Sequence, residues 1–161
     1  MYHCYVHLYL LGEQGRTFEI IKKMPPLEHF THEYMESSVP EEALAAKADI
    51  ILADLLTQQD AKEAVQKILR AKRKEAELIL LAGKDQVETF AEEFSEIKDI
   101  WICPMSEDEL RFRFLRWQQN CKMSKDFWQT SHFFEATINN VPNLVWYKDK
   151  NGIHEKVNDS F

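Results

Sequence analysis

The chain has 161 residues, with 20 basic and 27 acidic side chains, so its formal net charge is −7. This length predicts one complete domain with a remainder, rather than two full domains. Hydrophobic residues at 45% and charged residues at 29% are typical of a globular protein. The acidic excess argues against a nucleic-acid partner, because phosphate binding needs clustered lysine and arginine.

The ends and the cysteines indicate a protein of a reducing compartment. The first residues lack a basic segment, and no apolar run approaches the roughly 20 residues that a membrane span needs. Three widely spaced cysteines, Cys4, Cys103 and Cys121, form no CxxC pair. We therefore expect no membrane partner, no disulfide framework, no metal site or other cofactor, and a cytoplasmic location.

Strand patterns and helix patterns alternate along the first 120 residues. The segments that read as strands are 2–11, 29–35, 49–56, 78–81 and 100–102. The segments that read as helices are 17–24, a short helix from Pro40, 59–74 and 87–94. The runs 49–56 and 78–81 are almost wholly apolar, as in strands buried on both faces of a parallel sheet. The His and Tyr side of segment 2–11 is more polar than such burial predicts.

Five strand–helix repeats with short connections predict an α/β fold. The expected architecture is a flavodoxin-like, doubly wound sheet of five parallel strands, formed by residues 1–120. In open parallel sheets, binding and catalytic groups collect where the carboxyl ends of the strands meet. The residues expected there are Glu13, Asp54, Ala82, Cys103 and Pro104.

This set resembles the site of a response-regulator receiver domain, the phosphoryl-accepting module of two-component systems. In that family the third strand ends in the aspartate that accepts the phosphoryl group. An acidic pair after the first strand holds Mg²⁺, a Ser or Thr ends the fourth strand, and a Lys before a Pro ends the fifth. Asp54 matches the acceptor, and Pro104 matches the proline.

The remaining positions depart from the family pattern. Glu13 supplies at most one acid, Ala82 stands in place of the hydroxyl, and Cys103 stands in place of the lysine. Phosphoryl transfer needs cations that neutralise the moving oxygens, and Mg²⁺ needs several oxygen ligands. We therefore expect a degenerate receiver without catalytic residues, in which Asp54 is a vestigial phosphoacceptor. Two alternatives stay open: a receiver that still accepts a phosphoryl group on Asp54, and a flavodoxin-like domain that binds a small ligand.

Two other groups of residues are expected to carry no chemistry. His29 and His32 would lie on opposite faces of a strand, which predicts two separate histidines rather than a metal pair. Cys103 is expected to be a buried, inert thiol rather than an oxidation sensor.

A long helix is predicted to begin at Glu107, because no helix breaker follows until Pro142; a boundary near Ser124 is an alternative. At 1.5 Å per residue, about 30 residues would extend roughly 45 Å. The first apolar positions have 4-3-4 spacing: Leu110, Phe114, Trp117 and Cys121. Packing on the sheet is expected to account for Leu110 and Phe114. A second, shifted series with 4-3-4-3 spacing comprises Phe127, Ser131, Phe134, Ile138 and Val141. This series predicts a short parallel coiled coil and a homodimer through the linker helix at 121–141.

Residues 144–158 read as a strand, an Asn-Gly turn and a second strand, which is a strong hairpin signal. Residues 134–161 resemble the beginning of a PAS domain. The resemblance rests on three phrases: Asn140–Trp146 (NVPNLVW), Lys148–Gly152 (KDKNG) and Asn158–Phe161 (NDSF). The motif positions are Trp146, Asp149, Gly152 and Asn158. Residues 142–161 would then be a truncated PAS domain whose remainder lies further along a longer protein.

Together the two resemblances imply the regulatory part of a bacterial signal-transduction protein. Such a module would relay a conformational change through the helix to PAS and output domains in the same chain. The output domain would be a diguanylate cyclase (GGDEF) or a histidine kinase. The part of the protein in this chain is expected to have no enzymatic activity.

Overall fold

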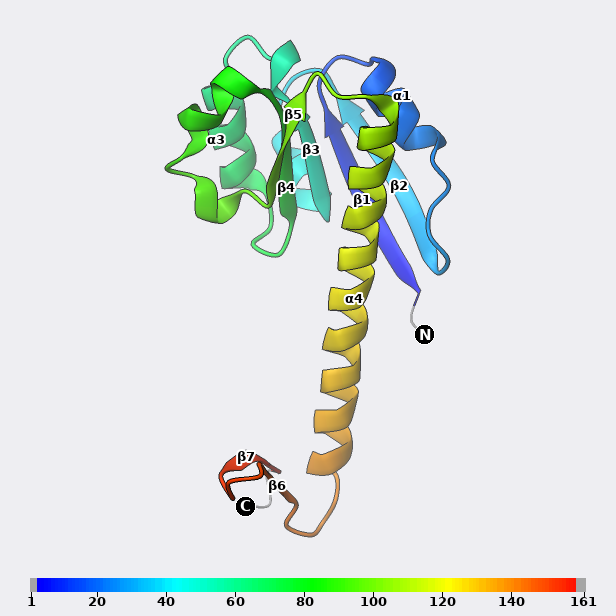
Figure 1. Cartoon of the computed structure of the whole chain (residues 1–161), viewed down its shortest axis with the longest axis vertical. Coiled ribbons are helices and arrows are strands. Elements are labelled where there is room, and N and C mark those ends of the chain that lie inside the picture. The colour runs from blue at the N-terminus through cyan, green and yellow to red at the C-terminus, as the bar shows by residue number, and fades with distance from the viewer. Residues whose placement is uncertain (1–2, 159–161) are drawn as a thin grey trace. The chain divides into compact units, whose positions relative to one another are not determined.

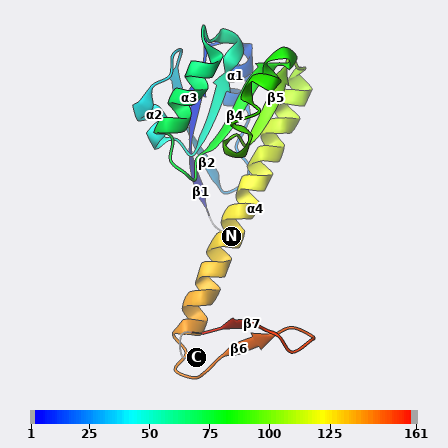
Figure 2. The ribbon, with the colours of Figure 1, turned by 90° about the vertical axis from the view of Figure 1, so that its left-hand side faces the viewer.

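A computed structural model describes residues 3–158 (Figures 1 and 2). The chain divides into two units: one contains residues 3–118, and the other contains the chain from Gln119 onward. The first unit holds a sheet whose strands are β1 (Cys4–Leu11), β2 (Phe30–Ser37), β3 (Ile50–Asp54), β4 (Glu77–Gly83) and β5 (Asp99–Cys103). These strands are parallel and lie in the order β2-β1-β3-β4-β5. This order confirms the predicted flavodoxin-like, doubly wound sheet.

Helices cover both faces of the sheet, which explains why β3 and β4 are apolar on both sides. The helices are α1 (Arg16–Lys23), α2 (Glu42–Lys47), α3 (Ala61–Ala71) and α4 (Glu107–Asn139). On one face, α2 and α3 bury Ala45, Val65 and Ile68 in a cluster with side chains of β1, β3 and β4. On the other face, α1 buries Phe18 and Ile21, and α4 buries Phe114. α2 and α3 lie together in Figure 2, away from α4.

The polar side of β1 has a structural explanation. β3 pairs with β1 only from Leu8 onward, so Tyr5 lies beyond the cover of the central sheet and is exposed. Tyr9, in contrast, is fully buried, and its hydroxyl bonds the Ser37 hydroxyl and accepts a hydrogen bond from the Glu41 N–H (3.0 Å). The buried Tyr9 hydroxyl thus has hydrogen-bond partners, as buried polar groups in proteins generally do.

The segment after β4 differs from the prediction. The helix expected at 87–94 is replaced by two 3₁₀ segments, Lys84–Phe90 and Phe94–Glu96. Phe90 is buried, but Phe94 is 79% exposed. Of these two phenylalanines, Phe90 alone packs in the core. The Gln86 side chain also accepts a hydrogen bond from the Gly83 N–H (2.9 Å), which favours a tight turn at the strand end. Burial of Phe90 by itself contributes too little packing to stabilise a longer amphipathic helix.

α4 runs without interruption from Glu107 to Asn139, so the predicted long helix is confirmed and no boundary occurs near Ser124. Its first part packs on the sheet as predicted, because Leu110 and Phe114 are buried; Trp117 is buried as well. We call residues 107–118, which belong to the first unit, the docked segment of α4. Among the described residues, no helix is both long and apolar enough to cross a membrane.

In the second unit, a hairpin follows the end of α4. Its antiparallel strands are β6 (Trp146–Lys148) and β7 (His154–Val157), which confirms the predicted hairpin. Gly152 has a φ of +80°, which suits glycine, and the Asp149 carboxylate accepts hydrogen bonds from the N–H groups of Asn151 (2.9 Å) and Ile153 (2.8 Å). The buried Asn158 accepts from the Val145 N–H (3.0 Å). The last three residues of the NDSF phrase lie outside the described residues.

Candidate functional site

The carboxyl ends of β1, β3, β4 and β5 meet at one edge of the sheet, which is where the sequence predicts the candidate site. Asp54 ends β3 and lies in register with Leu81 of β4, while Gly83 is in register with Cys103 of β5. A hollow of about 530 Å³ at this edge is lined by Asp54, Cys103 and Pro104, among others. The peptide bond between Cys103 and Pro104 is cis.

β4 contributes Leu81 to this hollow, whereas Ala82 is oriented toward the other face. Ala82 is fully buried in the core cluster that α2 and α3 cover. Successive side chains of a strand alternate between faces, so Leu81 shares its face with Asp54 and Ala82 does not. Ala82 therefore belongs to the core of this protein and does not line the hollow.

A second, smaller hollow of about 250 Å³ lies beside the first and shares Asp54 and Arg16 with it. Glu13 and Thr57 line it as well. The Thr57 hydroxyl accepts a hydrogen bond from the Glu13 N–H (3.2 Å) and donates one to the Asp54 carbonyl (3.1 Å). Thr57 thus joins the loop after β1 to the turn after β3, a role that the sequence pattern did not reveal.

Gly12 allows the close approach of these two loops. Its φ is +149°, and a Cβ atom there would lie 2.8 Å from the Asp54 Cβ and 3.0 Å from the Thr57 Oγ1. A side chain at this position would therefore meet both steric overlap and backbone strain. The close approach of the two loops therefore excludes a side chain at position 12 without rearrangement.

Asp54 sits in an environment that disfavours its charge. Burial raises the pKa of this carboxyl group, and the negative charge of Glu13 raises it further. The Leu56 N–H donates to Asp54 Oδ1 (3.0 Å) and acts in the opposite direction, but it does not outweigh burial. The neutral form of Asp54 is therefore favoured relative to that of an exposed aspartate.

Cys103 adds no positive charge where the family places a lysine. Burial raises the pKa of its thiol, and the negative charges of Asp54 and Glu109 raise it further, so the thiol stays protonated near neutral pH. Its Sγ atom lies 3.8 Å from the Trp101 carbonyl oxygen. Cys103 is partly buried and its thiolate is disfavoured, which makes it a poor nucleophile.

The cationic side chain that lines both hollows is Arg16, at the start of α1. Its side chain is 81% exposed, and its Nη2 atom lies 3.3 Å from Oε2 of Glu107 at the start of α4. Hydrogen bonds from Arg111 and Arg16 lower the pKa of Glu107, so that carboxylate is ionised and offsets the charge of Arg16. Glu107 thus lies between two guanidinium groups, those of Arg16 and Arg111.

Metal-ligating side chains do not cluster at this edge or elsewhere in residues 3–158, where no three His, Cys, Asp or Glu residues are placed to hold an ion. His29 precedes β2 with a φ of 66°, whereas His32 lies within β2 and contacts aromatic rings of α4. The two histidines thus have separate environments.

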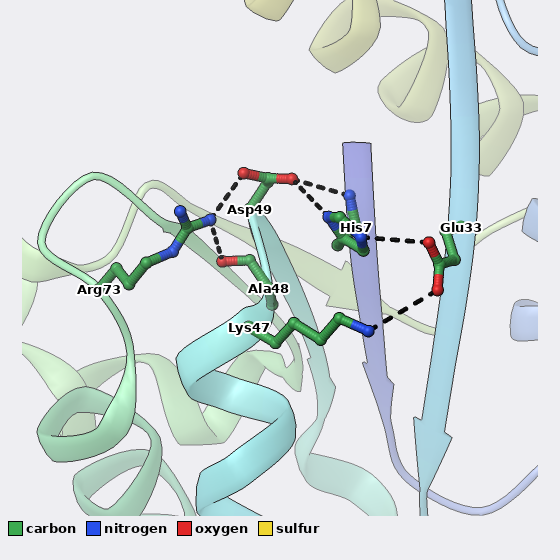
Figure 3. A network of polar contacts seen from close by, with 6 residues as sticks. All are labelled: His7, Glu33, Lys47, Ala48, Asp49 and Arg73. Carbon is green, nitrogen blue, oxygen red and sulfur yellow. Dashed lines mark hydrogen bonds and ion pairs between the residues drawn. The ribbon is translucent and has the colours of Figure 1, made fainter. Parts of the chain in front are cut away.

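A network of charged side chains lies on the sheet face opposite the docked segment, near the start of β3 (Figure 3). His7 of β1 lies between two carboxylates: its Nε2 is 3.1 Å from Glu33 Oε2, and its Nδ1 is 3.3 Å from Asp49 Oδ2. Asp49 also accepts a hydrogen bond from Arg73 Nη2 (2.7 Å), and Lys47 lies 3.8 Å from Glu33. This network joins β1, β2, the last residue of α2 and the loops that precede β3 and follow α3, and it accounts for the polar character of β1 at His7.

Comparisons with known proteins support the fold and go no further. No protein-family model matches the chain, and no curated protein sequence matches it. The adenylate cyclase from Rhodopirellula baltica aligns with a TM-score of 0.52 at 12% identity, over 79% of this chain and 98% of that one. The receiver domain of the sensor histidine kinase PA1611 from Pseudomonas aeruginosa aligns at 0.45 and 16% identity, over 72% and 99%. A protein described as a CpaE2 pilus assembly protein from Sinorhizobium meliloti aligns at 0.46 and 9%, over 66% and 95%.

Sequence identities this low carry no information on activity or ligands, so the strand order and the first of these alignments bear on architecture alone. Five parallel strands in the order β2-β1-β3-β4-β5, covered by helices on both faces, form the flavodoxin-like, doubly wound arrangement. Residues 3–118 therefore form a flavodoxin-like α/β domain.

Proposed function

We propose that residues 3–118 are a pseudo-receiver, a regulatory module of a bacterial signal-transduction protein in which Asp54 accepts no phosphoryl group. The observation that carries this proposal is the surroundings of Asp54: a protonated thiol at Cys103 and a carboxylate at Glu13 accompany it. The module acts by packing and conformation rather than by covalent chemistry.

The charge balance supports this proposal. A phosphoryl group carries between one and two negative charges near neutral pH and needs cationic partners. At this edge it would meet the negative charges of Glu13 and Glu107, with Arg16 as the cation and that cation already paired with Glu107. Arg111 and Arg113 of α4 are likewise paired, with Glu107 and Glu109, so an added phosphoryl group would compete with these carboxylates for its cationic partners.

Incubation of the chain with acetyl phosphate and Mg²⁺, followed by intact mass spectrometry, tests the proposal. An unchanged mass is the expected result. A gain of one phosphoryl group in the wild-type chain that is absent from Asp54→Ala would refute it. Cys103→Ala is the matched control, because it alters the same hollow and keeps Asp54.

We propose further that α4 conveys the state of the module to the domains that follow. α4 is one continuous helix whose docked segment packs on the sheet and whose last residue is Asn139. A shift in how the docked segment packs would move the same rigid element further along the chain. In this proposal residues 142–161 begin a PAS domain, and an output domain such as a diguanylate cyclase or a histidine kinase follows.

The part of α4 beyond residue 118 supports a homodimer. Large apolar side chains are exposed there: Met123 (70%), Phe127 (75%) and Phe134 (51%). Their spacings of four and seven residues place them along one side of the helix, where a parallel second copy would cover them. Exposed apolar groups on this scale are typical of an interaction surface.

Sedimentation equilibrium at tens of micromolar tests the homodimer. The full chain should sediment as a dimer, and Phe127→Glu combined with Phe134→Glu should give a monomer. Trp128→Glu is the matched control, because Trp128 is also exposed but projects from the other side of the helix. A monomeric wild-type chain would contradict the proposal.

A second candidate function, the binding of a small ligand, has one observation in its favour. The hollow of about 530 Å³ next to Asp54 lies within the size range of small-molecule sites, roughly 300–1,000 Å³. Native mass spectrometry of freshly purified protein tests it. A retained small molecule that Leu81→Trp expels would support ligand binding, and a spectrum of bare protein would count against it.

A further inference from the structure

The contact between β2 and the docked segment of α4 is built around one histidine. The ring of His32 lies 5.9 Å from that of Phe114 and 6.5 Å from that of Trp117, both on α4. On its own strand, Phe30 and Tyr34 flank it at 5.7 Å and 5.9 Å. His32 therefore occupies an aromatic cage that α4 closes.

The two ring nitrogens of His32 differ in their surroundings. Nδ1 lies 3.3 Å from the Tyr34 hydroxyl. Nε2 is shielded from solvent and has no hydrogen-bond partner within the described residues. A neutral imidazole needs only one donor bond, whereas the protonated ring carries two N–H donors. Protonation would thus leave a charged N–H buried against aromatic carbon, which is costly.

The nearest charged group on β4, the Glu77 carboxylate, accepts a hydrogen bond from the Trp117 indole N–H (2.6 Å) and pairs with Lys98, so it is engaged away from the His32 ring. The docked segment presents the rings of Phe114 and Trp117, and the residue in register on β1 is Val6. The ionisable neighbour on β2 is the Tyr34 hydroxyl, whose pKa burial raises to about 12, and that hydroxyl also donates to the Ile21 carbonyl of α1 (3.3 Å). Glu33 engages His7 and Lys47 on the opposite face. Accordingly, burial lowers the pKa of His32.

We propose that His32 is a proton-sensitive latch, in which protonation of the ring loosens the packing of the docked segment of α4 against β2. The latch itself depends only on the contacts described above. Its consequence for the domains that follow rests on the proposed function of α4.

The direction of the pH effect follows from linkage. A folded-state pKa below the unfolded value means that the unfolded or undocked state binds more protons. The stability that the neutral ring contributes is therefore present at higher pH and is lost as pH falls through the folded pKa. For one linked proton, the equilibrium constant for undocking rises by at most about tenfold per pH unit.

Hydrogen exchange of the full 161-residue chain, followed by mass spectrometry from about pH 7.5 to about pH 5, tests the latch. With rates corrected for intrinsic exchange, protection of residues 107–118 should fall on acidification by up to about tenfold per pH unit. Peptides from α3 serve as the internal reference and should change less. His32→Phe should abolish this loss of protection, whereas His3→Gln, at an exposed histidine, should retain it.

An NMR titration of the wild-type His32 ring makes the test independent of whether His32→Phe folds. Titration below the ordinary range of histidine is expected, together with a shift of the Trp117 indole N–H signal at the same midpoint. A His32 midpoint at or above the ordinary value, or equal loss of protection in wild type and His32→Phe, would overturn the latch. Phosphorylation of Asp54 would refute the pseudo-receiver and leave this result unchanged, so the two failures are distinguishable.

Discussion

Replacement of Phe114 by alanine should undock α4 and destabilise the α/β domain more than any change on the exposed side of the helix. Phe114 is fully buried, its ring stacks on Trp117 at 5.5 Å and 25°, and it also contacts the His32 ring. Truncation of a buried phenylalanine costs about 3–5 kcal/mol, which includes the cavity that remains. A domain of this size has a free energy of unfolding of about 5–15 kcal/mol, so the loss would be a large share of it.

Phe112 provides the matched control, because it is the same residue type on the same helix two positions away. It is 60% exposed, and its main contact is the Arg116 guanidinium, 5.4 Å above the ring. Such an exposed cation–π contact is worth about 0.5–1 kcal/mol, so Phe112→Ala should cost no more than that.

Urea unfolding followed by far-ultraviolet circular dichroism measures both variants. Phe114→Ala should lower the midpoint strongly with little change in the m-value, whereas Phe112→Ala should leave the midpoint almost unchanged. Equal losses in the two variants, or a loss below about 1 kcal/mol for Phe114→Ala, would show that the docked segment is not part of the core.

Three further predictions concern single side chains. Gly12→Ala should destabilise the domain by about 1–3 kcal/mol in thermal unfolding, because its added Cβ would lie 2.8 Å from the Asp54 Cβ at a φ of +149°; a neutral effect would contradict the close approach of the two loops. Asp54→Asn should stabilise the protein by about 0.5–1 kcal/mol at about pH 7. The pKa of Asp54 is raised in the folded protein, so its ionisation lowers the stability as pH rises through that pKa, and asparagine does not ionise. Unfolding measured at several pH values should show the advantage shrinking toward about pH 3, and a less stable variant at neutral pH would refute the sign. Asn158→Ala should expose the amides of residues 144–158 to faster hydrogen exchange by about tenfold or more, because Asn158 Nδ2 donates to the carbonyls of Ile138 (3.0 Å) and Asn143 (2.9 Å); unchanged exchange would show that these bonds do not hold the hairpin.

The sequence was sufficient to predict the sheet because its central strands are buried on both faces. Segments such as 50–53 and 78–81 are apolar throughout, and this pattern has few alternatives in a chain of alternating strands and helices. Asp54 could also be placed, since the carboxyl end of β3 follows directly from the end of the apolar run. The spacing of Leu110 and Phe114 likewise predicted which side of α4 packs on the sheet.

Features that depend on contacts between distant segments could not be predicted. The polar position of His7 on β1 is explained by Glu33 and Asp49, which contact its ring from other elements. The orientation of Ala82 depends on the register of β4 against β3, because a shift of one residue would bring it to the hollow. The 3₁₀ turns after β4 replace the predicted helix because Phe94 is exposed and does not pack in the core. The spacing of apolar residues does not show whether a given side chain will be buried.

The intact mass of the chain after exposure to acetyl phosphate and Mg²⁺ tests the central claim most directly. The surroundings of Asp54, with a protonated Cys103 thiol and the Glu13 carboxylate nearby, predict that the mass stays that of the unmodified chain. A stoichiometric phosphoryl adduct that disappears in Asp54→Ala would show instead that the domain is a phosphorylated switch.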